Sequence, residues 1–258
     1  MQLMQYEKKG NIGYIILNNP VKRNALSLAL MNEFQKQLQK NTKDKEIKVI
    51  IIKGNGPSFC VGHDIIELVG KEYDLAHFKK IFSTCTTLMK TIKEIPQVVI
   101  AQVHGAAFAA GCQLVAACDL AIAEHKAKFC TPGVKIGLFC STPMVPLSRV
   151  IGQRNAFDML FTGRIVTADE AKDFGLVNRV VDSNKLNEEA ERFAQEIAQH
   201  SRYTLEMGKK AFYNQIQQDE FLAYDYAKEI IAKNCLAYDA QEGMSAFLEK
   251  RKPQWKNR

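Results

Sequence analysis

Long apolar segments are absent from this sequence. No apolar run approaches the roughly 20 residues that a membrane-spanning helix needs, so the pattern does not indicate a membrane protein. The first residues are polar and contain lysine, without the hydrophobic centre of a secretion signal, and an Arg/Ser-rich transit peptide is also missing. We therefore expect a soluble protein with a cytoplasmic address.

Closely spaced pairs of metal-binding residues are missing as well. The seven cysteines are odd in number and show no Cys-x-x-Cys spacing, and none of the five histidines supplies a partner at zinc-site spacing. Most of the cysteines lie in apolar surroundings. This pattern predicts free, mostly buried thiols and no metal site.

The composition is that of an ordinary globular protein. Hydrophobic residues make up 47% and charged residues 24% of the 258 residues, which is enough chain for one large domain or one domain with an appendage. No internal repeat, low-complexity tract or long Gly/Ser linker divides it. The net charge of +7 suits an anionic ligand such as a phosphorylated cofactor, and it suits nucleic acid equally well.

Short β-branched runs alternate with helical patterns in the first two thirds of the chain. The expected strands lie at 14–17, 49–53, 98–101 and 120–123, and the expected helices run from Ser27 to about Lys40 and over 75–94. This alternation predicts an α/β fold with a buried, largely parallel sheet. After about Leu186 the strand signals end, and helical stretches follow at 186–200, 202–217, 219–237 and around Met244. We therefore expect an α/β core over 1–185 and a helical region over 186–258.

Two glycine-containing turns carry the functional signal. The segments 58–65 and 104–114 each lead from an expected strand into a helix. Their small residues allow backbone N–H groups to point at a ligand, and two converging N–H donors form an oxyanion hole. Taken singly, each segment is better interpreted as a tight strand-to-helix turn with no function.

Together, these turns resemble those of the crotonase superfamily, also called the enoyl-CoA hydratase/isomerase family. The supporting motifs are Asn18-Asn19-Pro20, Asn24-Ala25-Leu26, Leu160-Phe161-Thr162-Gly163, 168–177 and 242–252, which span nearly the whole chain. Further matches at 62–64, 110–113, 131–133 and 139–143 resemble one branch whose reaction is poorly defined. The resemblance implies a crotonase-like (ClpP/crotonase) spiral of ββα units, with a helical C-terminal trimerisation region.

The same resemblance implies a coenzyme A thioester as substrate and no permanently bound cofactor. The oxyanion donors would be the backbone N–H groups of His63 and Ala110. The residues expected to contact coenzyme A are Lys22, Arg23, Ala25, Val61, His63, Asp64, Ile65, Ile66 and Ala110, with Phe247 and Lys250 reaching in from a neighbouring subunit of a homotrimer or homohexamer. For the lysines and arginine, the alternative is an ordinary solvated surface.

The sequence departs from the family at the two positions where hydratases carry glutamates. Gln113 occupies the first and Gly133 the second, and no Asp or Glu occurs from Gly133 to Arg149. Hydration needs one group to activate water and another to protonate carbon, and neither residue exchanges protons near neutral pH. The ordinary hydratase mechanism is therefore not expected. The candidate catalytic positions are His63, Ala110, Gln113, Gly133, Cys140 and Ser141.

Several reactions remain open. Gly62-His63-Asp64 also resembles the methylmalonyl-CoA decarboxylase branch, and decarboxylation requires an oxyanion hole but no glutamate pair. Cys140 would be a nucleophile in thioester cleavage, although a buried inert cysteine is the commoner state. A non-catalytic CoA-binding protein is a further alternative. RNA binding ranks last, because clusters of interleaved basic and aromatic residues are weak.

Overall fold

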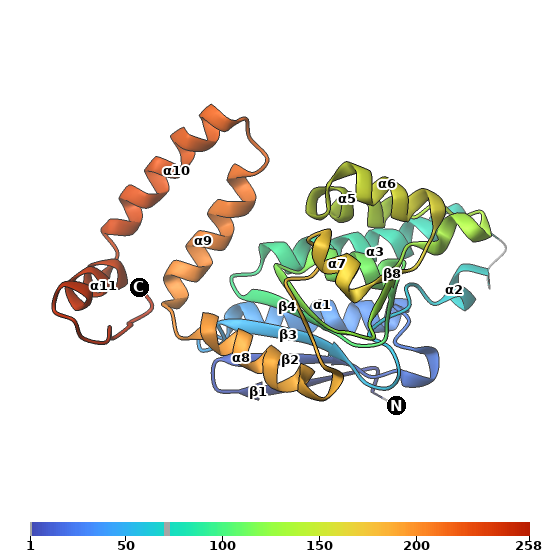
Figure 1. Ribbon diagram of the computed structural model, residues 1–258, viewed down its shortest axis with the longest axis horizontal. Coiled ribbons are helices and arrows are strands. Elements are labelled where there is room, and N and C mark those ends of the chain that lie inside the picture. The colour runs from blue at the N-terminus through green and yellow to red at the C-terminus, as the bar shows by residue number, and fades with distance from the viewer. Residues whose placement is uncertain (1, 70–72) are drawn as a thin grey trace.

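The computed structural model describes residues 2–69 and 73–258 (Figure 1). The strands are β1 (Met4–Lys9), β2 (Ile12–Leu17), β3 (Val49–Gly54), β4 (Val98–Val103), β5 (Ala106–Phe108), β6 (Leu120–Glu124), β7 (Lys128–Cys130), β8 (Val166–Thr167) and β9 (Arg179–Val181). The α-helices are α1 (Leu28–Lys43), α2 (Ile65–Val69), α3 (Leu75–Glu94), α4 (Ala110–Ala117), α5 (Ser141–Val150), α6 (Gly152–Thr162), α7 (Ala168–Asp173), α8 (Leu186–Ala198), α9 (Arg202–Gln215), α10 (Glu220–Cys235) and α11 (Tyr238–Leu248). Short 3₁₀ helices are η1 (Pro20–Lys22), η2 (Pro132–Ile136) and η3 (Ser183–Lys185).

A six-stranded sheet forms the centre of the molecule, in the order β1-β2-β3-β4-β6-β9. Only β1 pairs antiparallel with its neighbour, and the remaining pairs are parallel. A second sheet joins β5, β7 and β8, with β5 and β7 parallel. The α/β class and the largely parallel sheet expected from the sequence are therefore confirmed. The shortest strands, of two or three residues, carry too little pattern to be predicted.

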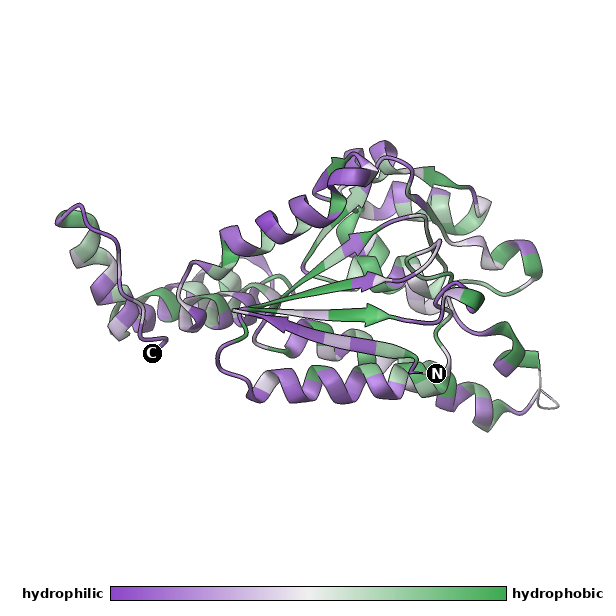
Figure 2. Cartoon of the chain, turned by 90° about the horizontal axis from the view of Figure 1, so that it is seen from below, coloured by the Kyte–Doolittle hydropathy of each residue, from purple (hydrophilic) through white to green (hydrophobic). Residues whose placement is uncertain are grey.

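Both faces of the inner part of the central sheet are buried, which explains why β2 and the first four residues of β3 are almost continuously apolar, unlike the edge strand β1. Ile15 and Ile50 belong to the larger core cluster, which includes α1, α3 and α4, whereas Ile16 and Ile51 point to the opposite face and pack with Phe193 of α8. Successive residues of a strand point to opposite faces, so a strand covered on both sides needs apolar residues at every position. Figure 2 shows this apolar band running through the strands between helices with hydrophilic outer sides.

Side-chain caps fix where the long helices of the core begin. Ser27 accepts a hydrogen bond from Leu30 N at the start of α1, and Asp74 accepts from Ala76 N and His77 N at the start of α3. Both helices then bury one apolar stripe against the sheet. Over residues 2–69 and 73–258, no helix has the length and apolar character needed to cross a bilayer.

The last three helices form an arm that extends away from the sheet (Figure 1). Lys209 of α9 fastens this arm to the core, because its Nζ donates to Ile92 O, Gln97 O and a carboxylate oxygen of Asp119 at 2.7–2.8 Å. Tyr213 Oη donates to the other oxygen of Asp119 at 2.7 Å. Asp119 is therefore a structural partner that joins the arm to the core. By contrast, α8 packs directly on the sheet, so the arm begins with α9.

Candidate active site

The two glycine-containing turns meet because the segments before them pair in parallel. Cys60 N donates to Ala106 O at 3.1 Å, and Phe108 N donates to Cys60 O at 2.9 Å, which places Cys60 beside Ala107 of β5. His63 follows three residues after Cys60, and Ala110 follows two residues after Phe108. Parallel segments end at the same edge, so both turns arrive at one place.

Two glycines allow the turns to touch. An ideal Cβ on Gly111 would lie 2.0 Å from Cys60 O, so only glycine lets the first turn of α4 rest on that carbonyl. Gly62 has a φ of +103°, and a Cβ there would lie 2.8 Å from the Cβ of Ala109 and 3.3 Å from Ala110 N. The backbone around residue 62 is thus in contact with the start of α4, as the proposed pairing of donors requires.

Ala109 holds a strained backbone conformation immediately before α4. Its φ of 48° and ψ of −117° lie in a region that alanine rarely occupies and that costs about 1–3 kcal/mol. The conformation is held by hydrogen bonds on both sides, from Ala109 N to Cys130 O at 2.8 Å and from Gln113 N to Ala109 O at 3.0 Å. This conformation sets the orientation of the peptide that carries Ala110 N–H, and no local sequence pattern indicates it.

Both expected donors are available. Among the described residues, neither His63 N–H nor Ala110 N–H has a hydrogen-bond partner. Ala110 is buried and is the first residue of α4, whose N–H groups and dipole favour negative charge at this end. An oxygen that gains charge here would be stabilised in a largely apolar setting.

The imidazole of His63 is also unpaired. Within the described part of the chain, neither Nδ1 nor Nε2 makes a hydrogen bond, and both atoms are buried. The ring packs edge-on against Phe82 of α3, with ring centroids 5.3 Å apart. Burial lowers the pKa of His63, with a smaller opposing effect from the backbone of Leu26, so the ring is neutral at pH 7. Its side chain therefore offers neutral hydrogen-bonding groups and no charge.

The loop before α1 is fastened to the segment 61–66. Leu26 N donates to Gly62 O at 2.7 Å. Asn24, fully buried, accepts from Asn19 N and donates to Asn55 O and Ser58 O at 2.8–2.9 Å. These contacts explain the Asn24-Ala25-Leu26 motif. Reasoning from the sequence alone missed this role.

Of the residues expected to bind coenzyme A, those in the core lie together. Lys22 Nζ forms an ion pair with the buried Asp64 at 2.6 Å, so Asp64 positions this lysine at the loop. Arg23 is exposed, with an αL backbone, and Ala25 is buried. Val61 is partly buried, and the side chains of Ile65 and Ile66 are 50% and 66% exposed, which places apolar surface next to Lys22.

Phe247 and Lys250 lie elsewhere in the protomer. Both are exposed, and they belong to the end of α11 and the turn after it. Figure 1 shows α11 at the opposite end of the molecule from α2. These two residues therefore do not join the His63 site within one protomer.

Gln113 is held by a neighbouring hydroxyl. Its side chain is buried, and its Oε1 accepts from Thr142 Oγ1 at 3.2 Å. Both residues line a cavity of about 640 Å³ between α3, α4, α5 and α9. A neutral amide in this position can orient a ligand, but it cannot exchange a proton as a carboxylate does.

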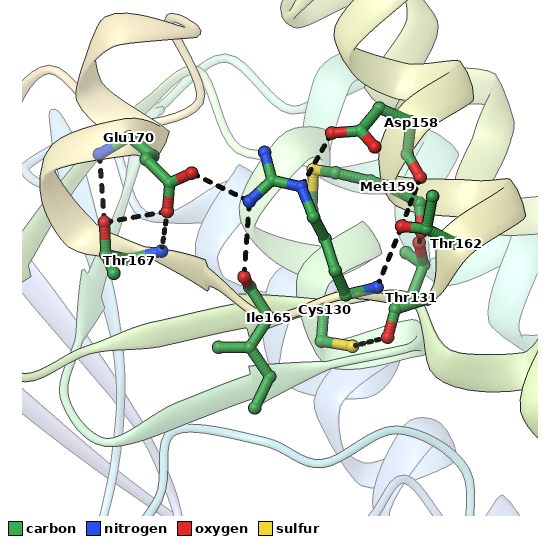
Figure 3. Close-up of polar contacts among 10 residues, drawn as sticks. Cys130, Thr131, Asp158, Met159, Thr162, Ile165, Thr167 and Glu170 are labelled. Carbon is green, nitrogen blue, oxygen red and sulfur yellow. Dashed lines mark hydrogen bonds and ion pairs between the residues drawn. The ribbon is translucent and has the colours of Figure 1, made fainter.

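The loop around Gly133 is closed on itself. Leu138 N donates to Gly133 O at 3.0 Å, and an ideal Cβ on Gly133 would lie 2.0 Å from Leu138 O and 2.8 Å from Cys140 Sγ. The residues before this loop are fastened to α6, because Thr131 Oγ1 donates to Met159 O and Cys130 Sγ to Gly163 O (Figure 3). No side chain fits at residue 133 without movement of the backbone.

The two nucleophile candidates are not activated. Burial raises the pKa of the Cys140 thiol, and the opposing effect comes from the backbone of Gly133, so the thiol stays protonated at pH 7. Ser141 Oγ donates to Phe139 O at 3.3 Å. In the described ranges, no group of three or more His, Cys, Asp or Glu side chains is placed to hold a metal ion.

The comparison with protein families accounts for this arrangement. Residues 7–258 match the family described as enoyl-CoA hydratase/isomerase. The chain therefore belongs to the enoyl-CoA hydratase/isomerase family, and the fold and family expected from the two turns are confirmed.

Individual relatives agree with this assignment. The chain is 43% identical over 254 residues to the enoyl-CoA hydratase domain-containing protein 3, mitochondrial, of Rattus norvegicus, covering 98% of this chain and 84% of the relative. A solved structure of the human protein of that name is 44% identical, covers 98% of this chain and 100% of that one, and has a TM-score of 0.96. An enoyl-CoA hydratase from Mycobacterium smegmatis is 42% identical, with 99% of each chain covered and a TM-score of 0.96.

These names confirm one expectation and correct another. The branch indicated by Gly62-His63-Asp64 and the neighbouring motifs is that of enoyl-CoA hydratase domain-containing protein 3. The expected cytoplasmic address is wrong, because the rat and human relatives are named mitochondrial. A polar start argues against a hydrophobic signal core, but it does not distinguish one aqueous compartment from another.

Proposed function

We propose that this protein is an acyl-CoA enzyme that stabilises negative charge on the thioester oxygen with the N–H groups of His63 and Ala110. The observation that supports it most is the pair of unpartnered N–H groups at two touching turns, one of them set by the strained Ala109. Strain maintained at a buried turn is typical of a functional site. Coenzyme A would lie along Lys22 and the segment 61–66.

The reaction that fits these residues best is decarboxylation of an acyl-CoA with a carboxylate on Cα. The bond between Cα and the carboxylate breaks, carbon dioxide leaves, and the electron pair passes to the thioester oxygen as an enolate, which then takes a proton at Cα from solvent water. The enolate oxygen would accept from His63 N–H and Ala110 N–H. Gln113 and Gly133 supply no acid or base, and this step does not require one before the carbon–carbon bond breaks.

Thioester cleavage by a protein nucleophile has less support. A protonated Cys140 thiol is a poor nucleophile. The Ser141 hydroxyl donates a hydrogen bond to the carbonyl of Phe139 in its own loop. Hydration has less support still, because the tight contact between Gly133 and Leu138 O leaves no room for the second glutamate.

Assays of the purified protein with methylmalonyl-CoA, crotonyl-CoA and a saturated acyl-CoA test the proposal. We expect carbon dioxide from methylmalonyl-CoA and negligible hydration of crotonyl-CoA. Turnover of crotonyl-CoA at an ordinary hydratase rate would contradict the proposed chemistry. Tight binding of acyl-CoA without any product would instead favour a non-catalytic CoA-binding protein.

For assembly, we propose a homotrimer, or a hexamer made of two trimers, through the arm. Phe247 and Leu248 on α11 are 82% and 80% exposed, which is unusual for large apolar side chains. In the assembly, Phe247 and Lys250 would reach a neighbour's coenzyme A site. Sedimentation of a Phe247→Ser variant tests this: we expect smaller species than wild type, and unchanged assembly would argue against the arm as the interface.

A further inference from the structure

A cavity lies beside Gln113, which is one helical turn after Ala110 on α4. It has a volume of about 640 Å³ and is bounded by α3, α4, α5 and α9. Gln113 and Thr142 lie at one part of its wall, and Lys93 and Arg149 lie at another. Such a volume is within the range of pockets that bind drug-sized ligands.

Helix geometry separates the two parts of this wall. Thr142 and Arg149 are seven residues apart on α5, which corresponds to about 10 Å along the helix axis and returns to nearly the same face. On α3, Thr86 and Lys93 have the same spacing and also line the cavity. Because Thr142 is hydrogen-bonded to Gln113, Arg149 lies roughly one medium-length acyl chain away from that amide.

The wall between these parts is mostly apolar. Met89 of α3, Val145 and Pro146 of α5 and Phe212 of α9 contribute to it. Val145 and Phe212 are each about half exposed in the protomer, so their apolar surface is available to a ligand. Methylene groups would bury this surface favourably.

The cations at the far end have no carboxylate partner among the described residues. Lys93 Nζ lies over the ring of Tyr213, 4.7 Å from its centroid, and the Arg149 guanidinium donates through Nη1 to Val145 O at 2.9 Å. Asp119 also lines the cavity, but its two oxygens already accept from Lys209, Tyr213 and Val99 N. Burial lowers the pKa of Lys93, the nearby charge of Asp119 opposes this effect, and the charge of Arg149 adds to it. An anion beside both side chains would relieve that repulsion.

We propose that the acyl group of the substrate runs from the two N–H groups through this cavity and ends in a carboxylate bound by Lys93 and Arg149. The inference rests on the proposed acyl-CoA function and adds the substrate class, an acyl-CoA with a terminal carboxylate. This carboxylate differs from the one lost in decarboxylation, which is attached to Cα beside the N–H groups.

A binding comparison between two acyl-CoAs of equal length tests this inference. Suberoyl-CoA and octanoyl-CoA both carry eight-carbon acyl groups, but only suberoyl-CoA ends in a carboxylate. With wild-type protein, calorimetry should give a Kd for suberoyl-CoA about 10-fold or more below that for octanoyl-CoA, the effect of one charge-assisted hydrogen bond. Equal affinities would overturn the inference and leave the proposed function intact. Failure of both ligands to bind would overturn the two together.

Variants of Lys93 and Arg149 test whether these two side chains cause the preference for suberoyl-CoA over octanoyl-CoA. Arg149→Gln and Lys93→Met should each remove most of the preference for suberoyl-CoA while leaving the Kd of octanoyl-CoA within about 3-fold, because only the carboxylate loses a partner. Matched controls are Arg154→Gln on α6 and Lys80→Met on α3, exposed cations outside the cavity, which should keep the preference. A preference that survives in both Arg149→Gln and Lys93→Met, or that is lost equally in the controls, would overturn the assignment.

Discussion

The backbone half and the side-chain half of this site differ in what they retain. The backbone half consists of the turns at 62–63 and 109–111, and its two N–H groups, its close glycine contacts and its strained alanine are all in place. The side-chain half consists of residues 113 and 133, and it holds an amide and a glycine, neither of which exchanges a proton near neutral pH. One half fits the proposed thioester chemistry, and the other offers no acid or base for hydration.

The difference follows from how each half is held. The donors are main-chain groups fixed by the pairing of Cys60 with β5, so they persist as long as the fold does. An acid or a base would be a side chain, which a single substitution can change while the sheet stays the same. At Gly133 the loop leaves no room for a side chain, so a single substitution would not place a carboxylate there without moving the backbone.

The largest effect is expected from breaking the backbone half at Gly111. Gly111→Ala places a Cβ 2.0 Å from Cys60 O, so the turns must separate, and we expect the free energy of unfolding to fall by about 3 kcal/mol, with loss of acyl-CoA binding. Urea denaturation and calorimetry measure the two effects. Gly208→Ala in α9 is the control: a Cβ there meets nothing, and stability should rise by about 0.5–1 kcal/mol. Equal responses of the two variants would contradict the close approach at Gly111.

Placing a glutamate in the side-chain half should lower stability at residue 133 and be tolerated at residue 113. Gly133→Glu meets Leu138 O, and we expect a loss of about 1–3 kcal/mol in urea denaturation. Gln113→Glu replaces one side chain by another of the same shape and should fold, yet it should not hydrate crotonyl-CoA, because the second carboxylate is still missing. Hydratase activity in Gln113→Glu alone would show that one carboxylate suffices here.

The pH dependence of stability distinguishes the imidazole of His63 from its amide. Burial lowers the pKa of the folded-state ring below its ordinary value of about 6.5, so the unfolded chain binds the proton more readily. Stability should therefore fall as the pH drops from 7 to 5. In His63→Gln this contribution is absent, so the fall should be smaller, while acyl-CoA binding through the amide persists. Parallel pH profiles for the two proteins would contradict a buried neutral ring.

The smallest effect is expected from relaxing Ala109. Ala109→Gly removes the penalty of a positive φ but gives the unfolded chain more freedom, so the free energy of unfolding should rise by at most about 1 kcal/mol. Acyl-CoA affinity should stay within a few-fold of wild type, because the hydrogen bonds on either side still orient Ala110. Thermal denaturation is the measurement. A clear loss of stability would mean that the methyl group packs in a way that offsets the strain.

Much of the fold could be predicted because its strands are long and buried. The runs at 14–17, 49–53, 98–101 and 120–123 all lie in the central sheet, and Ser27 caps α1 as expected. Strands of two or three residues, such as β5 and β8, depend on tertiary pairing and leave no periodicity. The packing of α8 on the sheet was likewise not visible in a helical pattern alone.

The site was predictable where residue type alone restricts the chemistry. Gln113 and Gly133 cannot serve as acid or base in any arrangement, so that conclusion needed only the family pattern. The backbone of Ala109, the hydrogen bonds of Asn24 and the pairing of Lys22 with Asp64 arise from conformation and long-range contacts. No local pattern in the sequence encodes them.

Vibrational spectroscopy of a bound acyl-CoA with an isotope-labelled thioester carbonyl tests the two-donor site most directly. Two hydrogen bonds from His63 N–H and Ala110 N–H polarise the carbonyl, so its stretching frequency in the complex should lie clearly below that of the ligand in water. A bound ligand whose carbonyl frequency equals or exceeds the value in water would contradict the assignment of these two amides as the oxyanion site.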